Sequence, residues 1–223
     1  MVLPTVGSRL GSLPGEIPIF PLTGALLLPS GQLPLNIFEP RYLAMVDSAL
    51  SRGRWFGMVQ PRDTKAQTVP DQHPLFSTGC LGRITTFSET TGGRYLITIT
   101  GVSRFEIEAE LDMRDGFRRV TTDYGAFSCD LESAKLNSDE RVALGLALRR
   151  YFDDRGHDAD WKALDKTPDE VLVASMAMAC SFNPAEKQAL LEAPDLSART
   201  ACLVAMLDMA AHDSGVEHGP ARH

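Results

Sequence analysis

The period of the hydrophobic pattern changes once along this chain, and that change constrains the fold more than any single motif. Up to about residue 125, apolar residues come in short runs interrupted by Gly and Pro, which is typical of short antiparallel strands. From Ser138 onward, apolar residues recur at helical spacing. Strands followed by helices predict an α+β fold: a small β pseudo-barrel with one inserted helix, then a helical bundle.

Turn and proline signals place the strands within the first half. Thr91-Gly92-Gly93 separates two apolar runs and predicts a hairpin. Gly101, in the middle of the second run, predicts a bulge or a bend. The stretch "EIPIFPL" carries Pro18 and Pro21, each of which lacks a donor for the ladder, so an edge strand or an irregular one is expected. Apolar residues of one parity would line one face of the second hairpin strand: Tyr95, Ile97, Ile99, Phe105 and Ile107.

The inserted helix is predicted from "LPLNIFEPRYLAMVDSAL", residues 33–50, where an extended pattern becomes helical at Glu39-Pro40. Pro40 suits the first helical position, and Glu39 just outside it would accept backbone N–H groups. Gly53 supplies the stop. The corner is either architecture, a strand leading into a helix, or a surface that contacts another molecule.

Start signals divide the second half into further helices. Residues 153–166, "DDRGHDADWKALDK", form a polar break, which is interpreted as a connecting loop or a short helix. The predicted N-caps are Ser138, Thr167 (followed by Pro168), Asn183 (followed by Pro184) and Asp195, with Glu170 and Glu186 at capping-box positions.

The formal charge of −7 is carried by the second half. Residues 1–125 contain 12 Lys+Arg and 12 Asp+Glu, whereas residues 126–223 contain 10 and 17. We therefore expect a flexible leader (1–15), a barrel subdomain (16–130), a helical bundle (131–212) and a disordered tail (213–223). No apolar run approaches the roughly 20 residues that cross a bilayer, and the N-terminus has Pro and Gly where a signal peptide is apolar. A soluble, cytoplasmic protein is expected.

Motifs of catalysis and of metal binding are missing from the sequence. It contains no GxxxxGK[ST], no GxSxG and no HExxH. No cysteines form a CxxC pair, and all four are expected to be buried free thiols: Cys80, Cys129, Cys180 and Cys202. His157 is assigned to an exposed loop. The chain is therefore predicted to be no enzyme and to hold no metal or cofactor.

Three segments, in this order, resemble the N-terminal substrate-binding domain of Lon, the ATP-dependent protease. The first is "IPIFPLTGALLLPSGQLPLNIFEPRYLAMVDSAL". The second, "FSTGCLGRITTFSETTGGRYLITITGVSRFEI", ends in a G-x-x-R-F element at Gly101, Arg104 and Phe105. The third, "NPAEKQALLEAPDLSARTACLVAML", matches an EKQ-x-LLE…R segment: Glu186, Lys187, Gln188, Leu190, Leu191, Glu192 and Arg199. The match runs over roughly residues 16–210.

This resemblance implies a PUA-like barrel followed by a helical bundle. The ATPase and Ser–Lys protease modules of Lon have no counterpart in the sequence, so the resemblance implies recognition of unfolded polypeptide or of a protein partner, in quality control or in regulation of proteolysis. Recognition would use an exposed apolar patch or an unpaired strand edge. Candidate contacts at the corner are Leu35, Phe38, Arg41 and Trp55.

Each candidate also has a structural interpretation. Phe38 and Trp55 are large apolar groups that usually pack inside, and Arg41 can pair with Glu39. Two other functions stay open. RNA binding is known for PUA-like barrels, but "MRDGFRRV" is the nearest cationic segment, and its arginines are mixed with Asp112 and Asp115. The second is an enzyme working in the crevice between barrel and bundle, which converging ionisable groups would favour.

Overall fold

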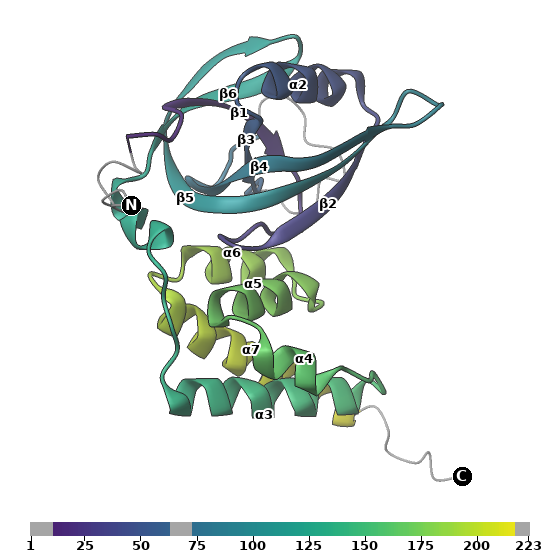
Figure 1. Cartoon of the computed structure of the whole chain (residues 1–223), viewed down its shortest axis with the longest axis vertical. Coiled ribbons are helices and arrows are strands. Elements are labelled where there is room, and N and C mark those ends of the chain that lie inside the picture. The colour runs from purple at the N-terminus through teal and green to yellow at the C-terminus, as the bar shows by residue number, and fades with distance from the viewer. Residues whose placement is uncertain (1–10, 63–72, 217–223) are drawn as a thin grey trace.

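The computed structural model describes residues 11–62 and 73–216, and it has two parts (Figure 1). A β-sheet carries α2 at one end, and a bundle of helices packs below the sheet in this view. The strands are β1 (Glu16–Pro21), β2 (Gln32–Ile37), β3 (Trp55–Val59), β4 (Thr78–Glu89), β5 (Tyr95–Arg114) and β6 (Phe117–Asp123). The predicted α+β fold is confirmed.

Strand pairings run in a ring through β5, β4, β3, β1 and β6, and β6 returns to β5. The ring can close because β5 is 20 residues long and pairs with different strands along its length. Its first half pairs with β2, and its second half pairs with β6. β1 and β3 are parallel, and all other pairs are antiparallel. The result is a pseudo-barrel with β2 added outside the ring.

The hairpin and the bend predicted for β4 and β5 are both confirmed. The register slips where Leu81 and Gly82 oppose Ser103 and Gly101, so one residue of β5 is extra. A Cβ on Gly101 would lie 2.0 Å from the Leu28 carbonyl oxygen, which explains the glycine there. The bend divides the apolar side chains of β5 between two clusters: Ile97 and Ile99 in the larger, Phe105 in the smaller.

The edge position predicted for residues 16–22 is wrong. β1 lies between β3 and β6. It pairs with β6 through residues 16–19 and with β3 through residues 19–21. Pro18 lies outside the part paired with β3, and Pro21 lies outside the part paired with β6. Each proline therefore has only one partner strand, and a strand with two neighbours tolerates both.

The helix predicted at Glu39-Pro40 is α2 (Pro40–Ser51), and Gly53 follows it with φ +88°, as a stop requires. The capping role predicted for Glu39 is wrong, because its side chain accepts no bond from the helix N-terminus. It accepts instead from Arg41, at 3.2 Å from Nε.

The bundle contains α3 (Ser138–Asp154), α4 (Trp161–Lys166), α5 (Asp169–Ala179), α6 (Pro184–Glu192) and α7 (Leu196–Val216). A 3₁₀ helix, η1 (Gly125–Leu131), leads into it from the barrel. The polar break, predicted to be a connecting loop or a short helix, contains the short helix α4. None of the helices that the structure describes is long and apolar enough to cross a membrane.

Two of the four predicted N-caps are confirmed. Asn183 forms a full capping box with Glu186, and Asp195 accepts a bond from the Ala198 N–H at 2.8 Å. Ser138 is wrong by one position, since Asn137 caps α3 in a capping box with Glu140. Thr167 with Glu170 is also wrong: Pro168 occupies the cap, and Glu170 accepts from the Ala134 N–H instead.

One apolar cluster spans barrel and bundle, with Leu28 and Met45 from the first and Leu144 and Leu190 from the second. α5 and α6 lie next to the barrel, and α3 lies on the far side (Figure 1). In the predicted leader, the Pro14 carbonyl accepts hydrogen bonds from the hydroxyls of Thr122 in β6 and of Tyr124. Residues 1–10 lie outside the described residues. α7 is helical through Val216, into the predicted tail, and residues 217–223 are likewise outside.

Candidate functional site

The structure places two of the four candidate residues at β2. Leu35 lies on β2 and is half-buried against the main core. Phe38 follows β2 and is 59% exposed, so the core-packing alternative is wrong for it. The guanidinium of Arg94 lies 5.7 Å from the centre of the Phe38 ring. These two residues are in reach of a molecule that binds at this strand.

The other two candidates lie at opposite ends of α2. Arg41, in its first turn, donates to Glu39 and lies 4.7 Å over the Tyr42 ring. Trp55 follows the end of the helix, half-buried, with Arg83 at 5.3 Å from its ring centre. The 12 residues of α2 separate them by about 18 Å at a rise of ~1.5 Å per residue. The four residues do not form one patch, and a binding role for each stays a prediction.

β2 is a free edge of the sheet. Among the strands that the structure describes, it pairs only with β5. The Gly101 N–H donates to the Gly31 carbonyl at 2.8 Å, so odd-numbered residues at the start of β5 direct their backbone groups at β2. In an antiparallel ladder the direction alternates from residue to residue. The odd-numbered residues of β2 therefore belong to the ladder with β5.

The even-numbered residues of β2 direct their backbone groups away from β5, toward the open side. They are Gln32, Pro34 and Asn36. Pro34 has no N–H, and an outward position on an edge strand is where a proline costs no ladder bond. The open side thus offers N–H and C=O from Gln32 and Asn36 and a C=O from Pro34. An extended backbone could pair with these groups.

A groove of about 540 Å³ runs between the open side of β2 and α5. Met178 of α5 packs directly against the start of β2, since a Cβ on Gly31 would lie 2.3 Å from its Sδ. A methionine wall adapts to side chains of different shape. The groove is lined by Gln32, Leu33 and Pro34 on one side and by Val171, Ser175 and Met178 on the other.

Exposed apolar side chains lie on both faces of the sheet near the far end of β2. Leu96 stands opposite Asn36 in the neighbouring strand and is 47% exposed. Phe87 of β4 is 40% exposed and contacts Tyr95 ring to ring at 5.0 Å. By this register Leu96 lies on one face of the sheet with Asn36, and Phe87, opposite Ile97, lies on the other face, so the two do not form one patch. The β4–β5 hairpin that carries them projects from the barrel (Figure 1).

A different surface of the barrel is closed by the bundle, and we call this contact the joint. At its centre Arg104 of β5 is completely buried. Its Nε and Nη2 donate to both oxygens of Asp130 at 2.9 and 2.8 Å, and Nη2 also donates to the Pro194 carbonyl at 2.9 Å. Nη1 donates to the carbonyls of Leu191 and Ala193. Burial opposes the charge of Arg104, but the bond to Asp130 and its charge raise the pKa overall.

Side-chain amides complete the joint. Gln60 of the barrel donates to Gln188 Oε1 at 3.3 Å and to the Pro184 carbonyl at 3.0 Å. Lys187 donates to the Gly24 carbonyl at 2.7 Å. Arg104, Lys187 and Gln188 belong to the segments that resemble Lon. Those segments therefore hold barrel and bundle together.

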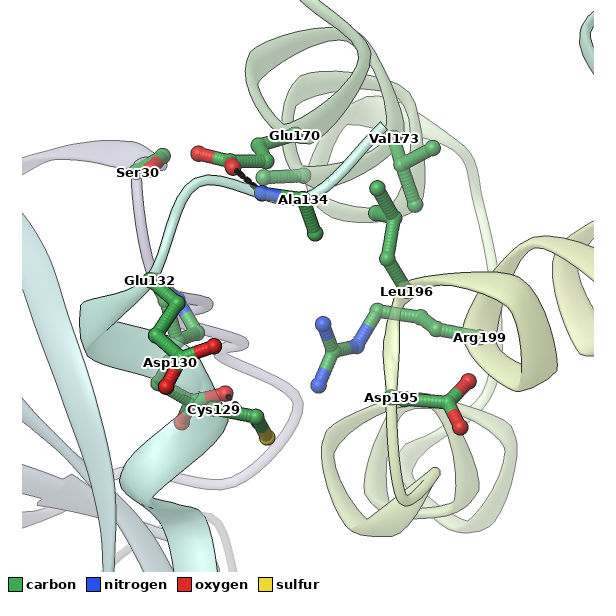
Figure 2. Close-up of a pocket in the computed structure, with 12 residues that line it drawn as sticks. Ser30, Cys129, Asp130, Glu132, Ala134, Glu170, Val173, Asp195, Leu196 and Arg199 are labelled. Atoms are coloured by element: carbon green, nitrogen blue, oxygen red, sulfur yellow. Dashed lines mark hydrogen bonds between the residues drawn. The ribbon is translucent and has the colours of Figure 1, made fainter. Parts of the chain in front are cut away.

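A cavity of about 70 Å³ lies beside the joint, where η1, α5 and α7 meet (Figure 2). The Arg199 guanidinium points into it, and Val173 and Leu196 supply apolar wall. Four carboxylates also line it: Asp130, Glu132, Glu170 and Asp195.

The enzyme alternative requires ionisable groups that converge in a cavity, and this cavity has them. Three of its carboxylates, however, form hydrogen bonds that hold the fold together. Asp130 is held by Arg104, Glu170 by the Ala134 N–H and Asp195 by the Ala198 N–H. No hydrogen bond among the described residues joins a nucleophile to a histidine. The described part of the chain likewise has no group of three His, Cys, Asp or Glu side chains that could hold a metal ion.

The prediction of four buried thiols is wrong for Cys129, which is exposed. Cys129 lies on η1 at the surface of the joint, with Arg104 Nη2 at 3.7 Å from its sulfur. Cys80 and Cys180 are buried, Cys202 is half-buried, and all four are free. Burial raises the pKa of Cys80 and Cys202, and it raises that of Cys180 to about 11.

The arginines of "MRDGFRRV" are each paired with a carboxylate. Arg118 binds Glu110 at 2.5 Å, Arg119 binds Glu16 at 2.8 Å, and Arg114 lies 3.8 Å from Asp115. Phosphate binding needs cationic groups that are not neutralised by their own protein. This segment therefore gives no support to the RNA alternative.

Fold and surfaces together define a class of protein: a barrel-and-bundle module with one open strand edge among the described strands. A family model described as the ATP-dependent protease La (LON) substrate-binding domain matches residues 16–209. The chain belongs to this family. The match is to the substrate-binding domain and not to the ATPase or protease module.

Relatives and solved structures agree with this assignment. Lon protease 2 of Sorangium cellulosum is 26% identical over 198 residues, and Lon protease 1 of Bdellovibrio bacteriovorus is 24% identical over 192 residues. The alignments cover 86% and 83% of this chain but 24% and 23% of those proteases. The crystal structure of a Lon N-terminal domain protein from Xanthomonas campestris has a TM-score of 0.62 at 20% identity, covering 85% of this chain and 97% of that one. The N-terminal domain of a Mycobacterium avium complex Lon protease also has a TM-score of 0.62, at 17% identity, with coverages of 86% and 98%.

Proposed function

We propose that this protein binds extended polypeptide segments, which add as a strand to the open side of β2. The observation that carries the proposal is the row of outward backbone groups at Gln32, Pro34 and Asn36, beside the groove to α5. Backbone pairing supplies affinity for any extended chain, and the groove supplies preference for apolar side chains. Membership of a substrate-binding family supports a polypeptide as the ligand.

The role we propose is non-enzymatic and cytoplasmic. The relatives are Lon proteases, so a module of this kind would hold clients or a protein partner for quality control, or regulate proteolysis by such contacts. The contacts need no catalytic group. They also predict little dependence on salt, because the groups of β2 and its groove carry no net charge.

The test is fluorescence anisotropy of a labelled, permanently unfolded polypeptide at two salt concentrations. We expect saturable binding that survives added salt. The informative variant is Asn36→Pro, which removes an outward N–H and places a ring where the added strand would lie. Loss of one backbone hydrogen bond with its contacts weakens binding by about tenfold.

Asn36→Ala is the matched control, because it changes the same side chain and keeps the N–H. It is expected to bind like the natural protein. If both variants bind equally well, strand addition at β2 is ruled out. If binding is saturable but disappears at high salt, a charged surface is responsible, and the RNA alternative is then tested directly.

A further inference from the structure

Arg199 presents a buried guanidinium to the cavity beside the joint. The residue is 6% exposed. Its Nε donates to the Leu190 carbonyl at 2.9 Å and its Nη2 to the Ala193 carbonyl at 3.4 Å. No carboxylate of the described residues binds it, and its Nη1 donates no hydrogen bond to them. The guanidinium points into the cavity (Figure 2).

A buried guanidinium without a carboxylate is costly, and the neighbourhood adds to the cost. Burial, and next the positive charge of Arg104, lower the pKa of Arg199. Arginine nevertheless stays protonated. An anion that enters the cavity would therefore gain a charge-assisted hydrogen bond from Nη1 and relieve this burial penalty.

The cavity lies at one end of the groove along β2. Ser30 lines both, so the two hollows lie next to each other at this residue. β2 runs from Gln32 to Ile37. A strand that adds to it antiparallel runs the opposite way, and its C-terminal end arrives at Ser30. The last group of such a strand is a carboxylate.

We infer that the cavity receives the free C-terminal carboxylate of the bound polypeptide, with Arg199 Nη1 as the donor. The inference rests on the proposed function, because β2 directs the chain into the cavity. Val173, Ala174 and Leu196 form the wall beside the carboxylate, and a cavity of about 70 Å³ limits the last side chain to a small apolar one.

The rim of the cavity adds a second preference. Asp195 and Glu170 each accept a backbone hydrogen bond, whereas the exposed Glu132 side chain accepts none from the described residues. These carboxylates attract a basic residue near the end of the client and repel an acidic one, and because they also oppose the terminal carboxylate, its binding depends on the hydrogen bond from Arg199. The ligand class is therefore a polypeptide that ends in a small apolar residue preceded by lysine or arginine.

The experiment compares three labelled nine-residue peptides by anisotropy. All have the same apolar core followed by lysine, and two of them end in alanine. One has a free C-terminus, one a C-terminal amide, and one an amide with aspartate in place of alanine. Hydrogen bonds to charged groups predict that the free acid binds about tenfold to a hundredfold more tightly than its amide.

The outcomes separate the two proposals. Equal binding of acid and amide overturns the carboxylate site and leaves strand addition intact. Tight binding of the aspartate amide also overturns it, since a side-chain carboxylate would then serve. Failure of all three peptides overturns strand addition and the C-terminal site together. Added acetate should compete only with the free acid.

Two variants give an independent check. Glu132→Lys changes an exposed side chain, so the fold is retained, and it should raise the affinity of the free acid relative to that of its amide by about threefold at low salt, because the lysine that both peptides share loses the same attraction in each. Arg199→Gln should abolish the preference for the acid, with thermal unfolding recorded in parallel because Arg199 also binds two carbonyls. A Glu132→Lys variant that changes the affinities of acid and amide by the same factor contradicts the assignment.

Discussion

The joint and the open side of β2 lie a few residues apart along β5, yet they are built in opposite ways. At the joint, Arg104 is buried and its guanidinium nitrogens donate to the carboxylate of Asp130 and to three backbone carbonyls. At β2, the outward backbone groups meet no strand among those described. The polar groups at the joint are hydrogen-bonded within the protein, whereas the outward backbone groups of β2 have no strand partner among the described strands.

The difference shows what each surface can do. A buried donor that lost its partner would be costly, so the joint holds one arrangement of barrel and bundle. An edge strand keeps its groups in water and exchanges them for a partner's backbone at small net cost. The segments that resemble Lon report the joint. β2 also lies within one of those segments, but its open side follows from strand pairing and not from a motif residue.

The largest effect is expected when Arg104 is replaced by Ala. Asp130, with 5% of its side chain exposed, would lose its partner, and three carbonyls would lose their donor. Removing one member of a buried pair costs about 3–5 kcal/mol of unfolding free energy. Equilibrium unfolding in urea measures it.

Arg150→Ala is the control for Arg104→Ala. It breaks the pair with Asp208, whose side chains are 59% and 37% exposed, so a cost below about 1 kcal/mol is expected. Similar losses in the two variants would show that the joint is no more important to stability than the surface.

A smaller effect is expected for the same substitution made at each surface, Gln188→Ala at the joint and Gln32→Ala on β2. Gln188 is 3% exposed and bonds Gln60, Glu192 and the Thr78 carbonyl. Its loss leaves buried partners unsatisfied, at about 1–3 kcal/mol. Gln32 is exposed, and its loss should change stability by less than about 0.5 kcal/mol. Urea unfolding measures the loss of unfolding free energy in both variants. Equal losses would show that the joint and the strand edge do not differ in their contribution to stability.

Local signals predicted the parts of the fold that depend on few residues. The hairpin at Thr91-Gly92-Gly93, the start of α2 at Pro40 and the cap at Asn183 are set by neighbours along the chain. The failures involve distant partners. Glu170 bonds Ala134, which lies 36 residues away, and not the start of its own helix. β1 tolerates its prolines because two strands from elsewhere in the chain divide its length.

The candidate site was less predictable for the same reason. Leu35 and Phe38 are predictable because they lie next to the change from extended to helical pattern at Glu39-Pro40. The open side of β2 depends on its pairing with β5, which is far away in the sequence. Arg199 belongs to the third segment that resembles Lon, so the sequence identifies it as a residue of interest. That its guanidinium points into a cavity depends on how η1, α5 and α7 meet. Met178 gave no signal that distinguishes a groove wall from core filling.

The smallest effect is expected for Arg41→Ala, at the corner between β2 and α2. Arg41 pairs with Glu39, and their side chains are 26% and 41% exposed, so the pair contributes less than about 1 kcal/mol to stability. The outward backbone groups of β2 do not involve it. Anisotropy should therefore give an affinity for unfolded polypeptide within about twofold of the natural protein, while Asn36→Pro loses about tenfold. A tenfold loss in Arg41→Ala with none in Asn36→Pro would reverse the assignment, because the client would then bind the helix corner and not the strand edge.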